Sequence, residues 1–244
     1  MSSRQYKVIG TGTPKLEGVD KVTGRAVFGA DVKLPRMLFG KVLRSPHANA
    51  IIWSINADEA AALPGVRAVV TGADFPVLVS GEPGSQGPIT EANRYHGQEV
   101  IARGRVHFHG QPVAAVAATS AEIAEEALDL ISVEYEVLPP ILTTEKAMEP
   151  DAQLLHPELH TKSEEGTHDR PSNVAEHLRF ERGSADDGFA QADVVVEESF
   201  ATQVVHQGYI EPESETALAH LDGRVEVWAN TQSVFHWRTN LATI

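Results

Sequence analysis

The polar run Asn230-Thr-Gln-Ser233 separates an apolar, strand-like segment from a segment with helical spacing. Backbone N–H groups at the start of a helix point outward and favour an anion or an electron-rich oxygen. A glutamine amide at this place can donate a hydrogen bond to the same ligand. Gln232 is therefore a candidate ligand-binding residue, although composition alone favours the plainer alternative that Thr231 or Ser233 caps the helix.

The second polar feature is the segment 206–212 (HQGYIEP), where an apolar run meets polar side chains and a proline. The plainer interpretation of this segment is an ordinary strand end. His206 and Tyr209 could line a route to a ligand, but packing is the favoured role for both. Glu211, Glu213 and Glu215 form a local acidic cluster that we interpret as a solvated face, because a metal site would need ligands from elsewhere.

Two histidine pairs are weaker candidates. His107 and His109 alternate, which could place two imidazoles on one face of a strand, but an exposed strand is the favoured interpretation. His156 and His160 have the spacing of a zinc-protease helix motif, which needs glutamate directly after the first histidine. Pro157 stands there, so we reject that site.

Other catalytic signatures are missing from the sequence. Gly10-Thr-Gly12 lacks a preceding strand and a third glycine, so it is not a dinucleotide fingerprint. The chain has no phosphate-binding loop and no G-x-S-x-G elbow. A free-standing hydrolase is therefore a weak hypothesis, because no pair of nucleophile and base is visible.

Apolar patterning predicts the elements of the first half of the chain. Helices are expected after two capping-box sequences, one starting at Asn56 and one at Thr119, and residues 76–97 read as a loop rich in glycine and proline. The expected strands cover 38–45, 50–56, 66–71, 99–102, 106–108, 112–118 and 132–138.

The second half begins with a polar stretch, 151–173, that has no period and is expected to be a linker. A short helix is expected at 185–191. Val234, Trp237, Leu241 and Ile244 fall on one helical face, so a last helix is expected there. The expected strands are 177–182, 193–205, 216–220 and 225–230.

Composition limits the function classes. The chain has 244 residues, 42% of them hydrophobic, and its 20 basic and 34 acidic side chains give a net charge of −14. Such a charge argues against a general nucleic-acid binder. The absence of cysteine excludes disulfides, thiolate nucleophiles and iron–sulfur clusters held by this chain.

The distribution of charge and hydrophobicity adds two expectations. Residues 1–75 carry 10 basic and 6 acidic side chains, a basic excess that hints at a docking surface. No window has about 18 consecutive apolar residues, so no membrane span is expected. The start of the sequence lacks an apolar signal region, and a cytoplasmic location is the default expectation.

The order of several short motifs resembles the molybdenum-binding subunit of the xanthine dehydrogenase and aldehyde oxidase family. Each motif is common alone, but their joint order is specific. The first group is similar to the family's α/β hammerhead domain: 21–31 (KVTGRAVFGAD), 44–51 (RSPHANAI), 63–66 (LPGV), 70–74 (VTGAD), 110–113 (GQPV) and 133–139 (VEYEVLP). The second group resembles the start of the molybdopterin-binding region: 183–193, 206–212 and 228–233 (WANTQS).

The resemblance implies an α+β fold class, an α/β hammerhead domain followed by the incomplete start of an α+β molybdopterin-binding domain. It implies an N-terminal arm at 1–17, the hammerhead domain at 18–150, a linker at 151–171 and the beginning of the cofactor domain at 172–244. In the family, a glutamine hydrogen-bonds the apical oxo ligand of molybdenum, and the matching residue here is Gln232.

The implied function is part of an enzyme that hydroxylates an aldehyde or N-heterocyclic carbon with oxygen from water. The implied cofactor is molybdopterin with molybdenum, as the cytosine dinucleotide, with 2Fe–2S clusters and FAD on partner subunits. The partners are then an iron–sulfur subunit, an FAD subunit or other electron acceptor, and the remainder of the molybdenum-binding subunit.

Two family features do not occur in the sequence: the glycine-rich G-G-G-F-G-G-K loop and the glutamate base near the far end of the subunit. No catalytic residue and no direct metal ligand are therefore assigned here, and the chain alone is expected to be inactive. A fragment is the favoured interpretation over a naturally split subunit. A non-catalytic scaffold or interaction subunit that kept the hammerhead fold is the alternative function.

Overall fold

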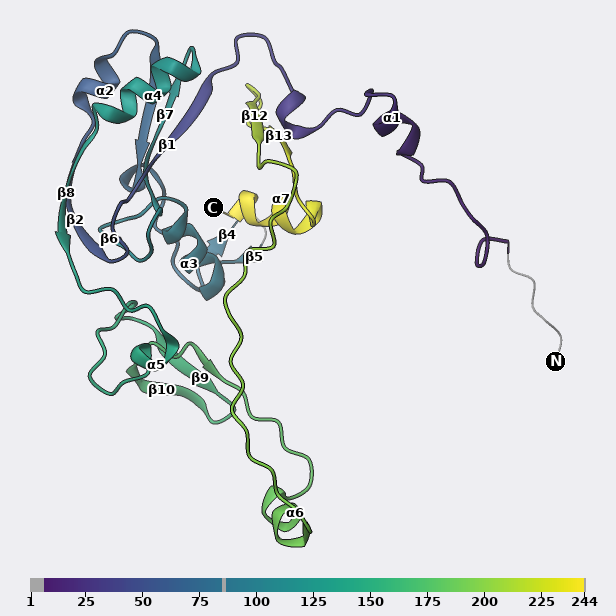
Figure 1. Cartoon of the computed structure of the whole chain (residues 1–244). Coiled ribbons are helices and arrows are strands. Elements are labelled where there is room, and N and C mark those ends of the chain that lie inside the picture. Colours follow the sequence, from purple (N-terminus) through teal and green to yellow (C-terminus); the bar gives the residue numbers. More distant parts are fainter. Residues whose placement is uncertain (1–6, 85–86, 244) are drawn as a thin grey trace. The chain divides into compact units, whose positions relative to one another are not determined.

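The computed structural model describes residues 7–84 and 87–243, except the side chain of Glu91 (Figure 1). The chain divides into two compact units. One unit comprises the residues up to Met37 together with Val205–Thr239. The other comprises Leu38–Val204 together with the residues from Asn240 onward.

The first sheet of the larger unit has the order β1-β7-β3 and is antiparallel throughout. Its strands are β1 (Phe39–Arg44), β7 (Pro112–Ala118) and β3 (Val66–Thr71). The central strand, β7, is an almost continuous apolar run, as expected for a strand covered on both faces. Helices α2 (Asp58–Ala62) and α4 (Ala121–Asp129) pack together beside this sheet (Figure 1).

Small side chains dominate the core between this sheet and the two helices. Alanines let α4 approach the strands closely, and the apolar spacing predicted for this helix is confirmed. The buried residues of this cluster are Ala60, Ala114, Val116, Ala118, Ala124, Ala127 and Ile131.

The second sheet has the order β6-β2-β8 and is also antiparallel. It is formed by β6 (Arg105–Val106), β2 (Ala50–Asn56) and β8 (Ser132–Val137). A second buried cluster, Ala50, Ala102, Val106 and Val113, joins residues of this sheet with β7. The predicted strands at 50–56, 66–71 and 112–118 are thereby confirmed with their bounds.

The stretch 76–102 differs from the predicted loop and strand. It follows η2 (Gly72–Asp74) and holds the short pair β4 (Pro83–Gly84) and β5 (Gly87–Pro88), and helix α3 (Glu91–Val100). The hydroxyl of Thr90 accepts the N–H of Asn93 at 3.1 Å, and the Asn93 side chain accepts from Thr90 in return. This reciprocal cap starts α3, so the strand predicted at 99–102 is wrong.

Both predicted capping boxes lie one residue away from the observed helix starts. In α4 the cap is Ser120, whose hydroxyl accepts the N–H of Ile123 at 3.3 Å, and not Thr119. In α2 the N-cap is Ala57, while the side chain of Asn56 accepts the N–H of Asp58 at 3.0 Å. The helices themselves were predicted correctly.

The segment predicted to be a linker without regular structure contains strands. After α5 (Thr144–Ala147), β9 (His160–Ser163) pairs antiparallel with β10 (Gly166–Pro171) and parallel with β11 (Glu176–His177). Gly166 turns the chain with a φ of +118°, a value that favours glycine. Polar side chains on both faces gave this hairpin no hydrophobic period, which is why the pattern missed it.

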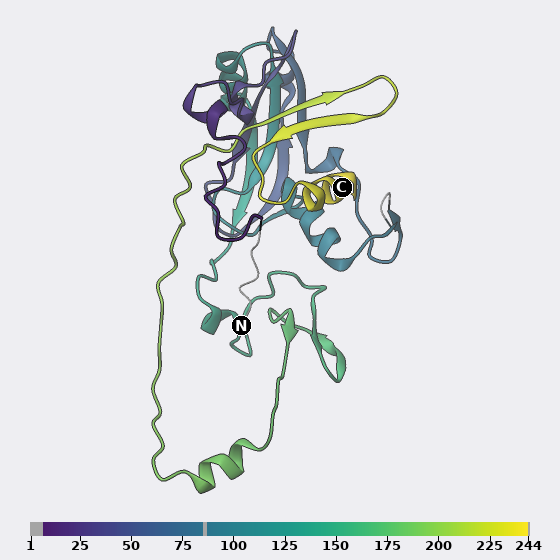
Figure 2. The same ribbon diagram turned by 90° about the vertical axis from the view of Figure 1, so that its right-hand side faces the viewer.

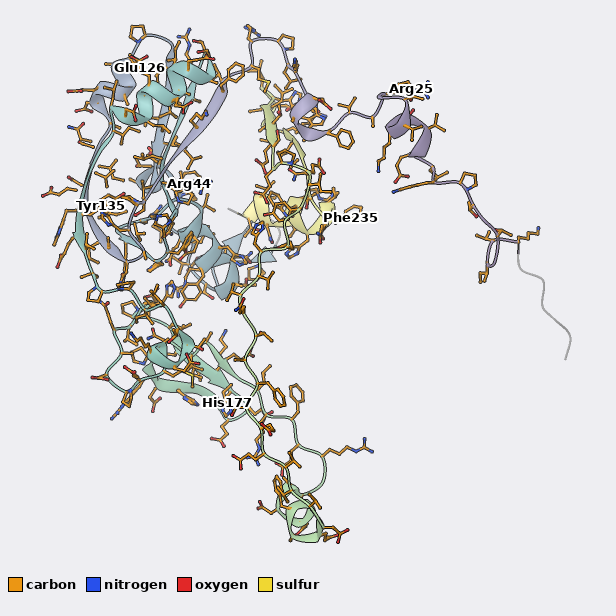
Figure 3. The ribbon with its side chains drawn as sticks, in the orientation of Figure 1. Arg25, Arg44, Glu126, Tyr135, His177 and Phe235 are labelled. Carbon is orange, nitrogen blue, oxygen red and sulfur yellow. The ribbon has the colours of Figure 1, made fainter. Side chains whose placement is uncertain are left out.

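Helix α6 (Ala185–Gln191) has the predicted bounds, but the strand predicted at 193–205 is wrong. The segment is extended and exposed, and it pairs with no strand in the described ranges (Figures 2 and 3). Its composition suits a strand, but a strand also needs a neighbour that accepts its backbone hydrogen bonds. The exposed apolar side chains here include Val194, Val196, Phe200 and Val204.

The smaller unit contains α1 (Gly18–Val22), η1 (Gly29–Asp31) and an antiparallel hairpin of β12 (Glu215–Ala219) and β13 (Val225–Ala229) (Figure 2). Gly29 lies so close to the chain before β12 that a Cβ there would meet the Ser214 carbonyl oxygen at 2.8 Å. The N-terminal part of this unit thus contains two short helical turns, α1 and η1.

Helix α7 (Val234–Thr243) follows β13, as predicted, while Ile244 of the predicted apolar face lies outside the described residues. None of the helices in the ranges 7–84 and 87–243 has the length and apolar composition needed to cross a bilayer.

Candidate functional site

Gln232 lies in the short connection between β13 and α7, and its side chain is exposed. No residue of the described ranges forms a hydrogen bond with its amide. The neighbouring Thr231 hydroxyl accepts the N–H of Ser233 at 3.2 Å, and the Asn230 side chain accepts the N–H of Ser214 at 2.9 Å. The local turn thus uses Thr231 and Asn230, which leaves the Gln232 amide available to a ligand.

His206 and Tyr209 are exposed, so the packing role expected for them is not observed in the described chain. Their rings lie 5.2 Å apart, and the Tyr209 hydroxyl donates to Glu213 at 3.2 Å. The negative charge of Glu213 raises the pKa of Tyr209. Glu211, Glu213 and Glu215 are exposed, as predicted for a solvated acidic face.

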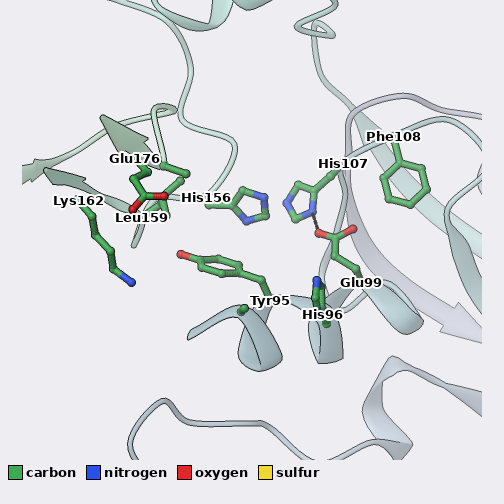
Figure 4. A pocket seen from close by; sticks show the side chains of 11 residues that line it. Tyr95, His96, Glu99, His107, Phe108, His156, Leu159, Lys162 and Glu176 are labelled. Atoms are coloured by element: carbon green, nitrogen blue, oxygen red, sulfur yellow. Dashed lines mark hydrogen bonds and ion pairs between the residues drawn. The ribbon is translucent and has the colours of Figure 1, made fainter. Parts of the chain in front are cut away.

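The larger unit contains a second group of chemically capable side chains, which the sequence did not bring together. Glu99 at the end of α3, His107 after β6 and His156 before β9 face one another (Figure 4). The Nδ1 atom of His107 lies 3.0 Å from Oε1 of Glu99. The rings of His107 and His156 are 4.4 Å apart, and Tyr95 contacts His156 edge-on at 5.1 Å.

Gln111 orients two members of this group. Its side chain is 0% exposed and donates through Nε2 to Oε2 of Glu99 at 3.0 Å. Its Oε1 accepts the backbone N–H of His107 at 2.7 Å. Both ends of the buried amide are therefore satisfied, and they fix the Glu99 carboxylate against His107.

Burial and the neighbouring His107 lower the pKa of His156, while Glu99 and Glu158 oppose the shift. A lowered pKa favours the neutral form of His156, which has a lone pair on one ring nitrogen. The group borders a cavity of about 590 Å³ whose wall includes Tyr95, Phe108 and Leu159.

The alternative in which His107 and His109 share one strand face is not observed, and the favoured interpretation of an exposed strand is wrong for His107. Strand β6 ends at Val106, so His107 turns inward and is half-buried whereas His109 is exposed. The rejection of the zinc-protease motif is confirmed, since neither His156 nor His160 lies in a helix. The signal that could have located α3, and with it Glu99, is the cap formed by Thr90 and Asn93.

Two family models match the chain in succession. Residues 23–139 match the α/β hammerhead domain of aldehyde oxidase and xanthine dehydrogenase. Residues 167–244 match the molybdopterin cofactor-binding domain. The two matches together cover most of the chain.

Curated relatives align along nearly the whole chain. A probable xanthine dehydrogenase subunit from Bacillus subtilis is 36% identical over 93% of this chain and 28% of its own length. The carbon monoxide dehydrogenase large chain of Afipia carboxidovorans is 34% identical over 100% of this chain and 30% of its own length.

Solved structures share the fold. The chain superposes on a Cu,Mo-containing CO dehydrogenase with a TM-score of 0.76 and 34% identity, covering 96% of this chain and 29% of the other. Quinoline 2-oxidoreductase from Pseudomonas putida 86 gives a TM-score of 0.73 and 31% identity, covering 98% and 29%.

The fold and the matches define a hammerhead domain followed by the start of a molybdopterin-binding domain. The chain belongs to the xanthine dehydrogenase and aldehyde oxidase family of molybdenum hydroxylases. It spans about 28–30% of the length of the two curated relatives described above.

Proposed function

We propose that this chain forms the N-terminal part of the molybdenum-binding subunit of an oxidoreductase. The proposed reaction is hydroxylation of an aldehyde or N-heterocyclic carbon with oxygen from water. The observation that carries this proposal is the succession of the two family matches, hammerhead and then cofactor domain, within one chain. The relatives that align with it along most of its length support the same proposal.

We propose the domain division 18–150 for the hammerhead domain and 172–244 for the start of the cofactor domain. Residues 1–17 form the N-terminal arm and 151–171 connect the two domains. The paired strands from β1 to β8, which lie between Phe39 and Val137, fall within the first of these ranges. The strands β9 and β10 give the connection a structure of its own.

Gln232 fits the proposed cofactor. When bound, molybdopterin with its metal supplies the redox chemistry of the reaction. The exposed amide of Gln232 has no partner in the described chain, so its Nε2 atom is available to donate a hydrogen bond to the oxo group of the cofactor. Such a bond would help to orient the bound cofactor and would adjust the electron demand at its metal.

Other parts of the enzyme complete the site. The base glutamate of the family would come from a part of the subunit beyond residue 244, and no catalytic residue is assigned to this chain. Because the chain has no cysteine, 2Fe–2S clusters would be held by a partner subunit. FAD on a further partner and the cytosine dinucleotide form of molybdopterin complete the proposed assembly, which we place in the cytoplasm.

The exposed apolar segment 193–205 supports the proposal that another protein surface covers it. Its side chains include Phe200, which is 91% exposed, and Val204, which is fully exposed. Leaving a run of large apolar side chains in water is unfavourable, so a covering surface stabilises this segment. We propose that the remainder of the molybdenum-binding subunit supplies that surface.

An isotope experiment tests the proposed reaction. The assembly that contains this chain is incubated with a panel of aldehydes and N-heterocycles, a dye as electron acceptor and water enriched in ¹⁸O. The proposal predicts a hydroxylated product whose new oxygen comes from the labelled water in single-turnover conditions. An assembly that contains molybdenum and turns over none of the panel, or a product oxygen from O₂, would contradict it.

A further inference from the structure

We propose that Glu99, His107 and His156 bind a divalent transition-metal ion, for which Zn²⁺ is the best match. Each residue offers one ligand atom, and the three atoms all lie within 4.8 Å of one another. Two imidazoles and one carboxylate are a donor set found in zinc sites that keep a fourth position open. The three residues belong to the larger unit and do not include Gln232, and the proposal does not depend on the proposed hydroxylase function.

The supporting contacts around the group are those of a metal site. Gln111 donates to Oε2 of Glu99, which leaves Oε1 directed at His107. Hydrogen bonds of this kind orient the ligands of metals and raise metal affinity. Because Gln111 is fully buried and also accepts the N–H of His107, it ties the carboxylate and one imidazole to the same fixed point.

The spacing of the ligand atoms is close to what a bound ion requires. Bonds of about 2.0–2.2 Å to nitrogen and oxygen place tetrahedral ligand atoms ~3.3 Å apart. The pair formed by His107 Nδ1 and Glu99 Oε1 is already at 3.0 Å. The ligand atom of His156 lies within 4.8 Å of the other two, so a bound ion would draw the His156 side chain closer.

The adjoining cavity, about 590 Å³ in volume, provides room for a fourth ligand. Its wall combines the apolar Phe108 and Leu159 with the rings of Tyr95 and His96 (Figure 4). Water or a small anion in this cavity would complete a tetrahedral ion. The competing interpretation is a simple ion pair between Glu99 and a protonated His107, which needs neither His156 nor a metal.

Metal binding by the purified assembly that contains the full chain distinguishes the metal site from the simple ion pair. The protein is stripped with a chelator, loaded with Zn²⁺ and examined by elemental analysis and by competition with a chromogenic chelator. Wild type should hold one zinc per chain. E99Q, H107Q and H156Q should each weaken binding by at least about tenfold. The control H109Q replaces an exposed histidine two residues away and should bind as wild type does.

X-ray absorption at the zinc edge needs only the wild-type protein, so it tests the proposal even if a variant does not fold. The zinc-loaded wild-type protein should show nitrogen and oxygen ligands at about 2.0–2.2 Å with the scattering of two imidazoles. A wild-type protein that holds no zinc after loading overturns the proposal. Equal zinc affinity in wild type and in folded H156Q also overturns it. The same elemental analysis measures molybdenum separately from zinc. A failure of the hydroxylase proposal can therefore be distinguished from a failure of the zinc proposal.

Discussion

The Nδ1 atom of His107 lies 3.0 Å from Oε1 of Glu99, while the second oxygen of the same carboxylate accepts a hydrogen bond from the buried Gln111. One carboxylate thus links the end of helix α3 to the chain that leaves β6. The arrangement depends on Gln111, because its amide also accepts the N–H of His107.

Replacing Gln111 with leucine should therefore destabilise the larger unit. The change leaves Oε2 of the half-buried Glu99 and the N–H of the half-buried His107 without their partner, which costs about 1–3 kcal/mol in all. Chemical denaturation of Q111L measures the loss of unfolding free energy. Q98L, on the half-buried Gln98 of α3, is the control and should differ little from wild type. Equal stability of Q111L and Q98L would remove Gln111 from its supporting role.

Gly72 should not tolerate a side chain. A Cβ at this position would lie 2.5 Å from the carbonyl oxygen of Ala102 and 3.2 Å from the Cα of Arg103, both of which are backbone atoms. G72A should lose about 1–3 kcal/mol through overpacking, measured as a lower unfolding free energy. G40A is the matched control, because a Cβ on Gly40 in β1 meets nothing within 4 Å. A G72A protein as stable as G40A would contradict the close approach.

Hydrogen exchange should reveal the surface that covers residues 193–205. In the isolated chain the amides of this extended segment should exchange quickly, because no described strand accepts their hydrogen bonds. In an assembly with the rest of the molybdenum-binding subunit they should become protected. The amides of β7, central in its sheet, serve as the internal control and should be protected in both samples. Fast exchange of 193–205 in both samples would contradict the proposed partner surface.

Gln232 should affect turnover rather than folding. In the molybdenum-containing assembly, Q232A should lower the turnover number about 10–100-fold, the range typical of residues that support a metal centre indirectly. The unfolding temperature should not change, since the Gln232 side chain is exposed. Q191A, at an exposed position of α6, is the control for removal of a glutamine amide. Unchanged turnover of Q232A would exclude Gln232 from the site.

The sequence predicted elements well where one local pattern was sufficient. The apolar runs of β2, β3 and β7 and the helix α6 have the predicted bounds. The loop predicted at 76–97 was wrong for α3, because the many glycines and prolines of that stretch outweighed the signal of its cap. The start of α3 is fixed by Thr90 and Asn93. The prediction was also wrong for 193–205, because strand composition does not by itself provide a neighbouring strand.

The two candidate sites differed in how far the sequence could locate them. Gln232 was singled out by a short polar run and by the family resemblance, whereas composition alone favoured a helix cap, and its role stays a prediction. Glu99, His107 and His156 come from three separate segments, and each alone reads as an ordinary surface residue. Tertiary packing, anchored by the buried Gln111, brings them together. The spacing of these residues along the chain does not predict that they meet in the fold.

Molybdenum analysis tests the central claim most directly. The chain is purified alone and in an assembly with the remainder of the molybdenum-binding subunit, and both samples are examined for molybdenum and for pterin. The account predicts one molybdenum per chain in the assembly and none on residues 1–244 alone. An assembly with no molybdenum would contradict the proposed function and favour a scaffold. Stoichiometric molybdenum on the isolated chain would contradict the proposal that the cofactor site is completed elsewhere.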